Sequence, residues 1–204
     1  MNTTDTIREI LRREADAILN IPVGDHFERA VSLIVEQVHN QGAKLVASGM
    51  GKAGQIAMNI ATTFCSTGIP AVFLHPSEAQ HGDLGILQED DVMLLVSNSG
   101  RTREILELLD LTARFRPNTR TIVITGNKDS ELARRADICL YTGGAPEVCP
   151  LGLTPTTSTT LMTVIGDILV VNTMKATQFD SQQYALRHHG GYLGQRSREQ
   201  SEKK

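Results

Sequence analysis

The chain has 204 residues, which is enough for one ordinary domain with a sizeable core and too few for two full domains without crowding. Hydrophobic residues make up 40% of it and charged residues 21%, a balance that fits a globular protein and excludes a disordered chain. The net charge is −3 and there is no long basic block, so we expect no nucleic-acid partner.

The sequence also argues against a membrane protein. The longest apolar candidate, Leu161 to Met174, is interrupted by Gly166 and Asp167 and is too short to span a bilayer. The N-terminus lacks the basic and apolar regions of a signal peptide. Three cysteines form no C-x-x-C pair, which is typical of reduced thiols, and by default they are expected as small buried residues. We therefore predict a cytoplasmic protein without membrane contact.

The first forty residues show helical periodicity. Apolar residues at helical spacing predict one helix before a break at Asn20 to Gly24 and a second helix from about Asp25. Gly42 is expected to close the second helix, as glycine commonly does. Residues 1–42 are therefore expected to form a helical segment packed on the domain that follows.

From residue 43 onward, short apolar runs alternate with helices. The expected strands are Lys44 to Ala47, Ala71 to Leu74, Val92 to Val96, Thr121 to Thr125 and Ile138 to Tyr141. The expected helices between and after them are Lys52 to Ser66, a helix that ends at Phe115, Ser130 to Ala136, and Pro155 to Ala176. This alternation predicts an α/β fold, a three-layer α-β-α sandwich with a five-stranded parallel sheet of the flavodoxin-like kind and added N-terminal helices. The domain is expected to span residues 43–194, followed by a polar, frayed tail at 195–204.

In such sheets a ligand binds beyond the carboxyl ends of the strands, where the strand order reverses. In the flavodoxin-like order this point lies between the first and third strands. The loops after those two strands are therefore the places to look for chemistry.

The loop after the first strand, residues 48–54, contains the pattern G-x-G-x-x-G at the start of a helix. A dinucleotide site would also need a carboxylate at the end of the next strand, but that strand runs into His75 and Pro76. A Walker A loop would need Ser or Thr after Lys52, where the chain has Ala53. The loop is thus either part of another ligand site or a tight glycine turn that lets helix and strand pack closely.

The loop after the third strand, residues 97–104, is more informative. Three hydroxyl residues and a glycine stand at the start of a helix, where free backbone amides and the helix dipole favour an anion. Capping the helix would need only one such residue. We therefore predict that this loop binds a phosphate.

A run of hydroxyl residues from Thr154 to Thr160 opens the last long helix. Such residues are poor in a helix interior but suit an N-terminus whose amides need acceptors. The run either caps the helix several times over or forms a third wall of the ligand pocket, and the residues alone leave both interpretations open.

Residues 97–104 resemble the phosphosugar-loop signature of sugar isomerase (SIS) domains. The resemblance extends over five further motifs, at residues 49–54, 66–68, 75–76, 81–85 and 147–155, and the hydroxyl run behind them. Together, over about residues 25–194, they are similar to bacterial arabinose-5-phosphate isomerases. The resemblance implies an aldose–ketose isomerase that interconverts D-ribulose 5-phosphate and D-arabinose 5-phosphate through an enediol, for a lipopolysaccharide or capsule precursor. No cofactor would be required.

The resemblance also implies the residues of the site. The catalytic residues would be Lys52, Glu104, Glu147 and His188. The substrate-binding residues would be Ser48, Gly49, Gly51, His81, Ser97, Asn98, Ser99, Gly100, Thr102, Thr156 and Ser158. His75 corresponds to a position linked with zinc, which we expect as an adventitious or inhibitory ion.

Two departures from the family pattern matter. The usual His-Pro-Gly-Gly becomes His188-His189-Gly190-Gly191, which leaves open which histidine acts. Many relatives carry a C-terminal pair of CBS domains, whereas this chain resembles the short members without them and is expected to lack adenylate regulation.

Three alternatives remain. One is a non-catalytic SIS sugar-phosphate regulator, another is an isomerase of a different sugar phosphate, and a dehydrogenase is more distant. The joint presence of Glu104, Glu147 and His188 favours an enzyme. The apolar surplus of the helices and the resemblance predict a homo-oligomer, with a tetramer favoured, in which His188 completes a neighbour's site.

Overall fold

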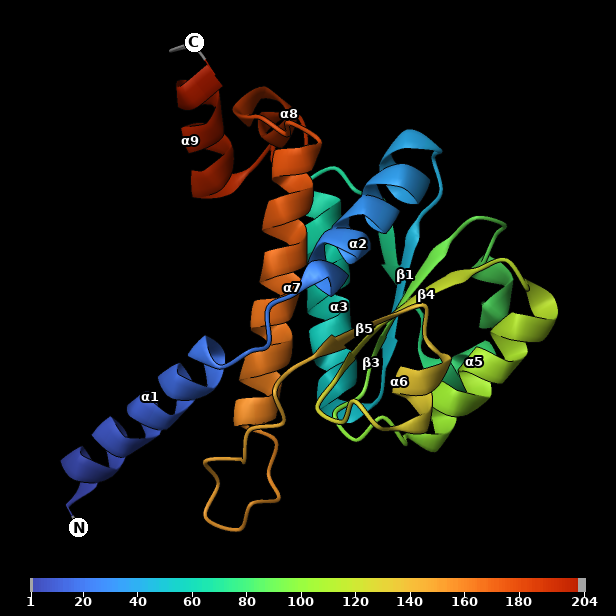
Figure 1. The fold of residues 1–204 in the computed structure, drawn as a ribbon. Helices are drawn as coiled ribbons and strands as arrows, with labels where there is room; N and C mark the ends of the chain where they lie inside the picture. Colours follow the sequence, from blue (N-terminus) through green and yellow to red (C-terminus); the bar gives the residue numbers. More distant parts are fainter. Residues whose placement is uncertain (1, 202–204) are drawn as a thin grey trace.

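The computed structural model describes residues 2–201, and its centre is a five-stranded parallel sheet (Figure 1). The strands are β1 (Leu45–Gly49), β2 (Ala71–Phe73), β3 (Val92–Val96), β4 (Arg120–Thr125) and β5 (Ile138–Tyr141). Their order is β2-β1-β3-β4-β5, and every neighbouring pair is parallel, with Leu45 opposite both Ala71 and Val92. The predicted α/β fold and its strand order are therefore confirmed.

Helices cover both faces of the sheet and make the three layers. One face packs against α2 (Asp25–Ile34), α3 (Gly51–Ser66) and α7 (Thr157–Ala176), and the other against α4 (Pro76–Ala79), α5 (Arg103–Phe115) and α6 (Glu131–Arg135). Because side chains alternate along a strand, Leu94 points to the α3 and α7 side while Met93 and Leu95 point to the α5 side. All three are fully buried, and burying each such side chain contributes about 1.5–3 kcal/mol.

The N-terminal segment behaves in two ways. Helix α2 continues into η1 (Val35–Asn40), a π-helical stretch, and their buried side chains join the core before Gly42 ends the segment at a φ of 80°. Helix α1 (Thr3–Leu19) instead projects from the body, and Ala17 is its one buried residue (Figure 1). Its apolar side chains Ile7 and Leu11 are 52% and 65% exposed. The second helix of this segment thus belongs to the core, whereas the first contacts the body mainly near its C-terminal end.

The sequence patterns missed four elements and placed the start of α7 early. The missed elements are α4, the 3-10 helix η2 (Asp83–Ile86), α8 (Ser181–Ala185) and α9 (Gly191–Ser201). Residues 195–201 of the predicted frayed tail form the second half of α9, and residues 202–204 lie outside the described residues. Helix α7 begins at Thr157, two residues after the predicted start. No helix among residues 2–201 is long and apolar enough to cross a membrane.

Asp91 holds the amino ends of two central strands together. This residue is 1% exposed, and its carboxylate accepts hydrogen bonds from the Lys44 amide at 2.9 Å, the Gln88 amide at 2.8 Å and the Lys44 ammonium at 2.6 Å. Buried amides need such acceptors, because an unpaired one costs about 1–3 kcal/mol. Asp91 therefore fixes the start of β1 against the start of β3, at the edge opposite their carboxyl-end loops.

We expect Asp91→Ala to lower the free energy of unfolding by about 3 kcal/mol or more, because it leaves two amides and an ammonium group without their acceptor. Urea denaturation at fixed protein concentration measures the loss. Glu89→Ala is the matched control: its exposed pair with Arg116 should contribute less than about 1 kcal/mol. Equal, small losses in both variants would contradict this role of Asp91.

Candidate functional site

The glycine loop after β1 is built for close packing. A Cβ atom on Gly49 would lie 2.8 Å from the Ala53 carbonyl oxygen, and one on Gly54 would lie 2.6 Å from the Gly49 carbonyl oxygen. Both glycines are thus required for α3 to start directly against the end of β1. Ser48 is fully buried, and its hydroxyl donates to the Leu74 carbonyl at 2.6 Å. This bond ties β1 to the end of β2, so Ser48 does not face a ligand as predicted.

Farther along this loop, Gly51 and Lys52 are open to solvent. Gly51 has a φ of 56°, and a Cβ atom there would meet nothing within 4 Å. Gly51 and Lys52 are both exposed in the first turn of α3. The first amides of a helix have no intrahelical acceptor, so this turn can face an anion with free amides and the Lys52 ammonium.

The predicted phosphate loop after β3 closes on itself. The Ser97 and Thr102 hydroxyls lie 2.8 Å apart and share one hydrogen bond, and the Gly100 amide donates to the Ser97 hydroxyl at 3.2 Å. Only one of the two hydroxyl hydrogens is used in their mutual bond, so the other can still donate outward. Thr102 is the N-cap of α5, yet its side chain makes no capping bond. The loop therefore presents uncapped amides together with a free hydroxyl hydrogen.

The neighbouring strand holds this loop in place. The Asn98 carbonyl accepts from the Gly126 amide at 3.0 Å, and the Asn98 and Ser99 side chains are exposed. Gly100 has a φ of 61°, and a Cβ atom there would lie 2.0 Å from the Ser130 hydroxyl. No larger residue fits at Gly100, so the loop has one shape, with Ser99 at its exposed tip.

The two predicted catalytic glutamates both lie beyond the carboxyl ends of the strands. Glu104 is half-buried in the first turn of α5. Glu147 lies in the loop after β5, and its Oε2 atom accepts three hydrogen bonds at the start of α7. The donors are the Thr156 amide at 2.7 Å, the Thr156 hydroxyl at 2.9 Å and the Ser158 amide at 3.2 Å. Glu147 thus caps α7, and its Oε1 atom makes none of these bonds.

The protonation state of Glu147 follows from these contacts. Partial burial disfavours the charged form, but the hydrogen bonds from Ser158 and Thr156 outweigh burial and hold the pKa of Glu147 below its usual value. The carboxylate is therefore ionised at neutral pH. Thr156, predicted to bind substrate, donates both its amide and its hydroxyl to Glu147, which favours the capping interpretation at that position. Ser158 donates only its amide, and its hydroxyl is buried without a hydrogen-bond partner.

The two histidines after β2 lie on the same side of the sheet. His75 precedes α4, and its Nδ1 atom is buried without a hydrogen-bond partner. His81 is exposed just after α4. Among the described residues, no three His, Cys, Asp or Glu side chains converge to hold a metal ion. Within the described part of one chain, His75 thus belongs to no set of three such ligands, which is a poor fit to a resident metal.

The structure separates His188 from the other predicted catalytic residues. Glu147 is bound to the first residues of α7, whereas His188 follows α8, beyond the other end of that helix. A helix of 20 residues is about 30 Å long. Arg187 lies against Gly68 at the far end of α3, while Lys52 is at its start. The His188 ring stacks on the Tyr184 ring with the two ring centroids 3.8 Å apart. The Nδ1 atom of His188 lies 3.0 Å from the Tyr184 carbonyl oxygen.

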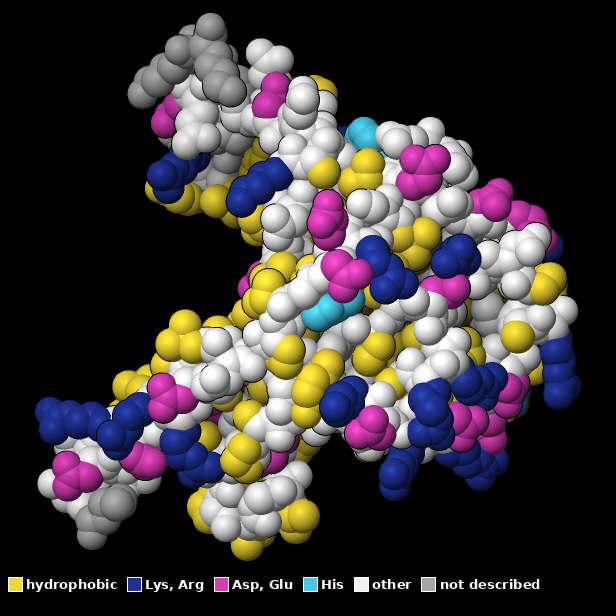
Figure 2. Space-filling model, in the orientation of Figure 1, with side chains coloured by type: hydrophobic (Ala, Val, Ile, Leu, Met, Phe, Trp, Pro, Cys, Tyr) yellow, Lys and Arg dark blue, Asp and Glu magenta, His cyan; other side chains and the backbone are white. Residues whose placement is uncertain are grey.

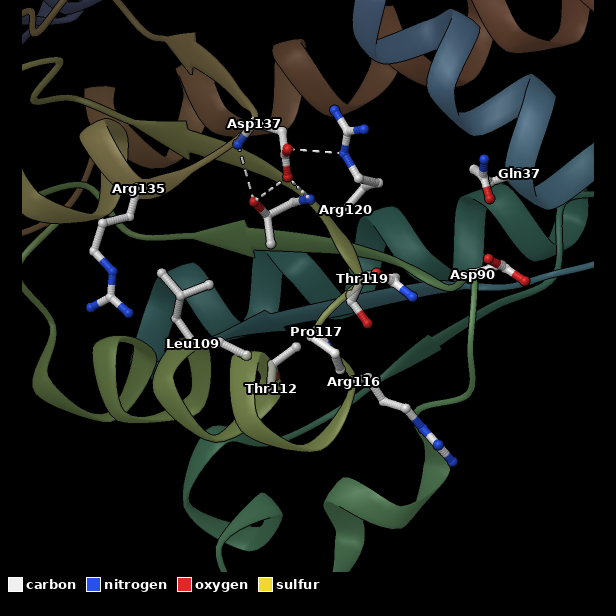
Figure 3. Close-up of a pocket in the computed structure, with 13 residues that line it drawn as sticks. Gln37, Asp90, Leu109, Thr112, Arg116, Pro117, Thr119, Arg120, Arg135 and Asp137 are labelled. Carbon is white, nitrogen blue, oxygen red and sulfur yellow. Dashed lines mark hydrogen bonds and ion pairs between the residues drawn. The ribbon is translucent and has the colours of Figure 1, made fainter.

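A cavity of about 740 Å³ lies at the opposite edge of the sheet, near the start of β4 (Figure 3). Three arginines line it, but each is already paired with carboxylates: Arg116 with Glu89, Arg120 with Asp137, and Arg135 with Asp110 and Glu131. None of the predicted site residues lines this cavity. Its cations are neutralised, so we assign the anion site to the carboxyl edge of the sheet instead.

The cysteines differ from their expected role. Cys65 is exposed, and Cys139 and Cys149 are half-buried, so none of them is a fully buried core residue. Hydrogen bonds from the Thr154 side chain and from nearby backbone amides lower the pKa of Cys149 to about 6. The Cys149 thiol is thus the more acidic of the two half-buried thiols, since burial raises the pKa of Cys139.

The sequence patterns missed three residues that contact the Glu147 loop. Arg13 donates to the Glu147 carbonyl oxygen at 2.9 Å. Glu14 accepts from the Thr157 hydroxyl at 3.0 Å. Their partners lie 134 and 143 residues away in sequence, so no local pattern announces them. Thr157 alone had a signal, as a member of the hydroxyl run.

The chain is therefore a doubly wound α/β protein. At the carboxyl ends of its strands it presents helix N-termini and hydroxyl groups to an anion. Among known protein families, the SIS domain matches residues 37–172. The chain belongs to the SIS-domain family.

Similar proteins point in one direction. The chain is 42% identical over 186 residues to arabinose 5-phosphate isomerase KdsD of Pseudomonas aeruginosa. The aligned region covers 91% of this chain and 55% of that protein. The chain thus spans about half the length of the curated relatives it matches.

Two solved structures are similar over nearly the whole chain. A Bacteroides fragilis protein, described as a proposed phosphosugar isomerase involved in capsule formation, has 68% identity and a TM-score of 0.92, covering 94% of this chain and 100% of its own. An Escherichia coli CFT073 protein in complex with arabinose 5-phosphate has 34% identity and a TM-score of 0.81, covering 92% and 100%.

We expect Ser99→Ala and Thr102→Ala each to weaken the binding of inorganic phosphate about tenfold or more, because each removes one hydroxyl donor and a hydrogen bond to a charged group is worth about 1.5–3 kcal/mol. Phosphorus NMR titration measures the dissociation constant. Thr62→Ala is the control, since that exposed hydroxyl bonds only within α3. Parent-like affinity in both loop variants would mean that the loop does not hold the phosphate.

Proposed function

We propose that the chain is an aldose–ketose isomerase that interconverts D-ribulose 5-phosphate and D-arabinose 5-phosphate. The observation that carries the proposal is that the phosphate loop and two carboxylates, Glu104 and Glu147, lie at the same edge of the sheet. The relatives named arabinose 5-phosphate isomerase, and the similar protein in complex with arabinose 5-phosphate, support this substrate. A non-catalytic regulator could dispense with Glu104 and would need Glu147 only as the cap of α7.

The phosphate would be bound without a required cation. The amides at the start of α5 and the Ser99 and Thr102 hydroxyls would donate to its oxygens, and the dipole of α5 would favour its charge. Gly51 and Lys52 would close the other side of the site from α3. The binding energy of the phosphate would thereby hold the sugar carbons in place for proton transfer.

The reaction moves one proton between neighbouring carbons. A carboxylate takes the proton from C2 of the open-chain aldose, the C–H electron pair forms the C1–C2 double bond of the enediol, and the C1 carbonyl oxygen takes up the negative charge. The carboxylate returns the proton to C1, and the proton of the C2 hydroxyl passes to the negatively charged C1 oxygen, which produces the ketose. Glu147, which is ionised at neutral pH, and Glu104 would between them act as the general base and as the proton relay. The Lys52 ammonium would stabilise the oxyanion.

His188 would open the sugar ring or carry protons near neutral pH, but only in the site of another subunit. Within one chain, the length of α7, about 30 Å, lies between it and Glu147. Figure 2 shows a hollow between α1 and α9 with hydrophobic side chains along its walls. The exposed Ile7 and Leu11 of α1 and Leu193 of α9 suit burial against a second copy. We therefore favour a homo-oligomer, and a tetramer in particular, with shared active sites.

The same proposal covers cofactor and location. Proton transfer through an enediol needs no nucleotide, and the donor set around His75 does not suit a resident metal, so zinc would act as an adventitious or inhibitory ion. We place the enzyme in the cytoplasm, in the supply of a capsule or lipopolysaccharide precursor. The similarity to a protein linked with capsule formation supports the capsule.

The purified chain should interconvert ribulose 5-phosphate and arabinose 5-phosphate without added nucleotide or metal, and a chelator should leave the rate unchanged. A panel of other pentose and hexose phosphates, assayed in parallel, tests the choice of sugar. Turnover that strictly requires added NAD or zinc would contradict the mechanism, and faster turnover of another sugar would contradict the substrate.

Mixing two inactive variants, His188→Ala and Glu104→Ala, under conditions of subunit exchange should restore activity. In shared sites, Glu104 from one chain meets His188 from the other, so a random equal mixture should recover about a quarter of the parent rate. Mass measurement confirms the exchange. If exchange occurs and no activity returns, His188 does not act across a subunit boundary. The parallel variant His189→Ala shows whether the neighbouring histidine is the one that acts.

A further inference from the structure

Residues of helix α1 hold the peptide group that follows Glu147 through hydrogen bonds. The peptide that joins Glu147 to Val148 has two polar atoms, and both are held. Its oxygen accepts from Arg13 Nη2 at 2.9 Å, and its N–H donates to the Thr157 hydroxyl at 3.2 Å. The Thr157 hydroxyl in turn donates to Glu14 Oε1 at 3.0 Å. A chain of hydrogen bonds thus runs from α1 through α7 to the residue that carries the proposed catalytic carboxylate.

Because Thr157 is buried, each group in this chain of hydrogen bonds has a fixed role as donor or acceptor. Thr157 is 1% exposed, so its hydroxyl cannot turn to solvent. Because the hydroxyl accepts from the Val148 amide, it needs an acceptor for its own hydrogen, and Glu14 supplies it. The other Glu14 oxygen, Oε2, is buried without a hydrogen-bond partner, which is a cost that a purely solvated carboxylate would not bear.

The two ends of Glu147 are thereby fixed independently. Its carboxylate is held through Oε2 by Thr156 and Ser158, and its backbone is held from α1. Helix α1 also packs Ala17 and Ile18 against the core, and the polar contacts of Arg13 and Glu14 add one turn further toward its N-terminus. Proton transfer is sensitive to such placement, because a shift of about 1 Å can cost about 100-fold in rate.

We propose that Glu14 is a positioning residue that acts through Thr157, with Arg13 beside it, to set where the Glu147 carboxylate meets the sugar. This inference rests on the proposed isomerase function. Glu14 itself does not touch the reacting atoms.

The test compares two matched pairs of variants. Glu14→Leu and Thr157→Val remove the hydrogen bond while keeping apolar bulk, and Glu14→Gln and Thr157→Ser keep an oxygen in place. We expect kcat to fall about 10- to 100-fold in the first variant of each pair and largely to recover in the second. The KM should stay within about twofold, because the phosphate loop is untouched.

Two controls separate positioning from general damage. Glu9→Leu removes another carboxylate of α1, whose ion-pair partner Arg12 is on α1 itself, and should keep the parent kcat. The double variant Glu14→Leu/Thr157→Val should be no slower than either single variant, since the two residues act in series. All variants are compared at equal oligomer mass. Parent-like kcat in Glu14→Leu, or independent losses that multiply in the double variant, would overturn the proposal.

A readout without substrate keeps the inference separate from the proposed function. Hydrogen–deuterium exchange over residues 146–158 should be at least about tenfold faster in Glu14→Leu and Thr157→Val than in the parent and in Glu9→Leu. If the parent isomerises no sugar phosphate, the proposed function fails, and unchanged exchange in both variants would show that Glu14 does not hold this loop either.

Discussion

The site depends on helix N-termini whose amides have no acceptor within their own helix. Parallel strands followed by helices bring the starts of α3, α5 and α7 to one edge of the sheet. These three ends are treated in two ways, because α3 and α5 both lack a side-chain capping bond and α7 does not. Helix α7 receives the Glu147 carboxylate, whereas the N-cap of α5 makes no side-chain bond and leaves its amides open. A ligand with negative charge completes what the fold leaves unsatisfied, which is why an anion and not an aromatic cofactor suits this edge.

Glu147 has two tasks that constrain each other. As a cap it stabilises α7, and its pKa is lowered, so this stabilising contribution is present at neutral pH and is lost as pH falls through the lowered value. As a proton acceptor it needs a free oxygen, and all three capping bonds end at Oε2. Fixing one oxygen orients the other, so the cap is also the device that prepares the carboxylate for chemistry.

The sequence was sufficient for the sheet and its strand order, because five continuous apolar runs separated by helical segments admit few topologies. The motif at residues 97–104 likewise predicted a loop that the structure shows to be preorganised through Ser97 and Thr102. Periodicity predicted α1 but could not tell what covers its apolar face. The family resemblance could not tell a free hydroxyl from a bonded one, and it implied Ser48 as a ligand contact although its hydroxyl donates to the Leu74 carbonyl. Contacts such as Glu14 with Thr157 join distant segments and needed coordinates.

A crystal structure of the chain with arabinose 5-phosphate tests the central claim most directly. We expect the phosphate oxygens within about 3.2 Å of the amides and hydroxyls of residues 97–102, with the first two sugar carbons between Glu104 and Glu147. His188 of a neighbouring subunit should reach the same sugar. A phosphate bound beside Arg116 and Arg120 at the opposite edge, or a sugar out of reach of both carboxylates, would contradict the account.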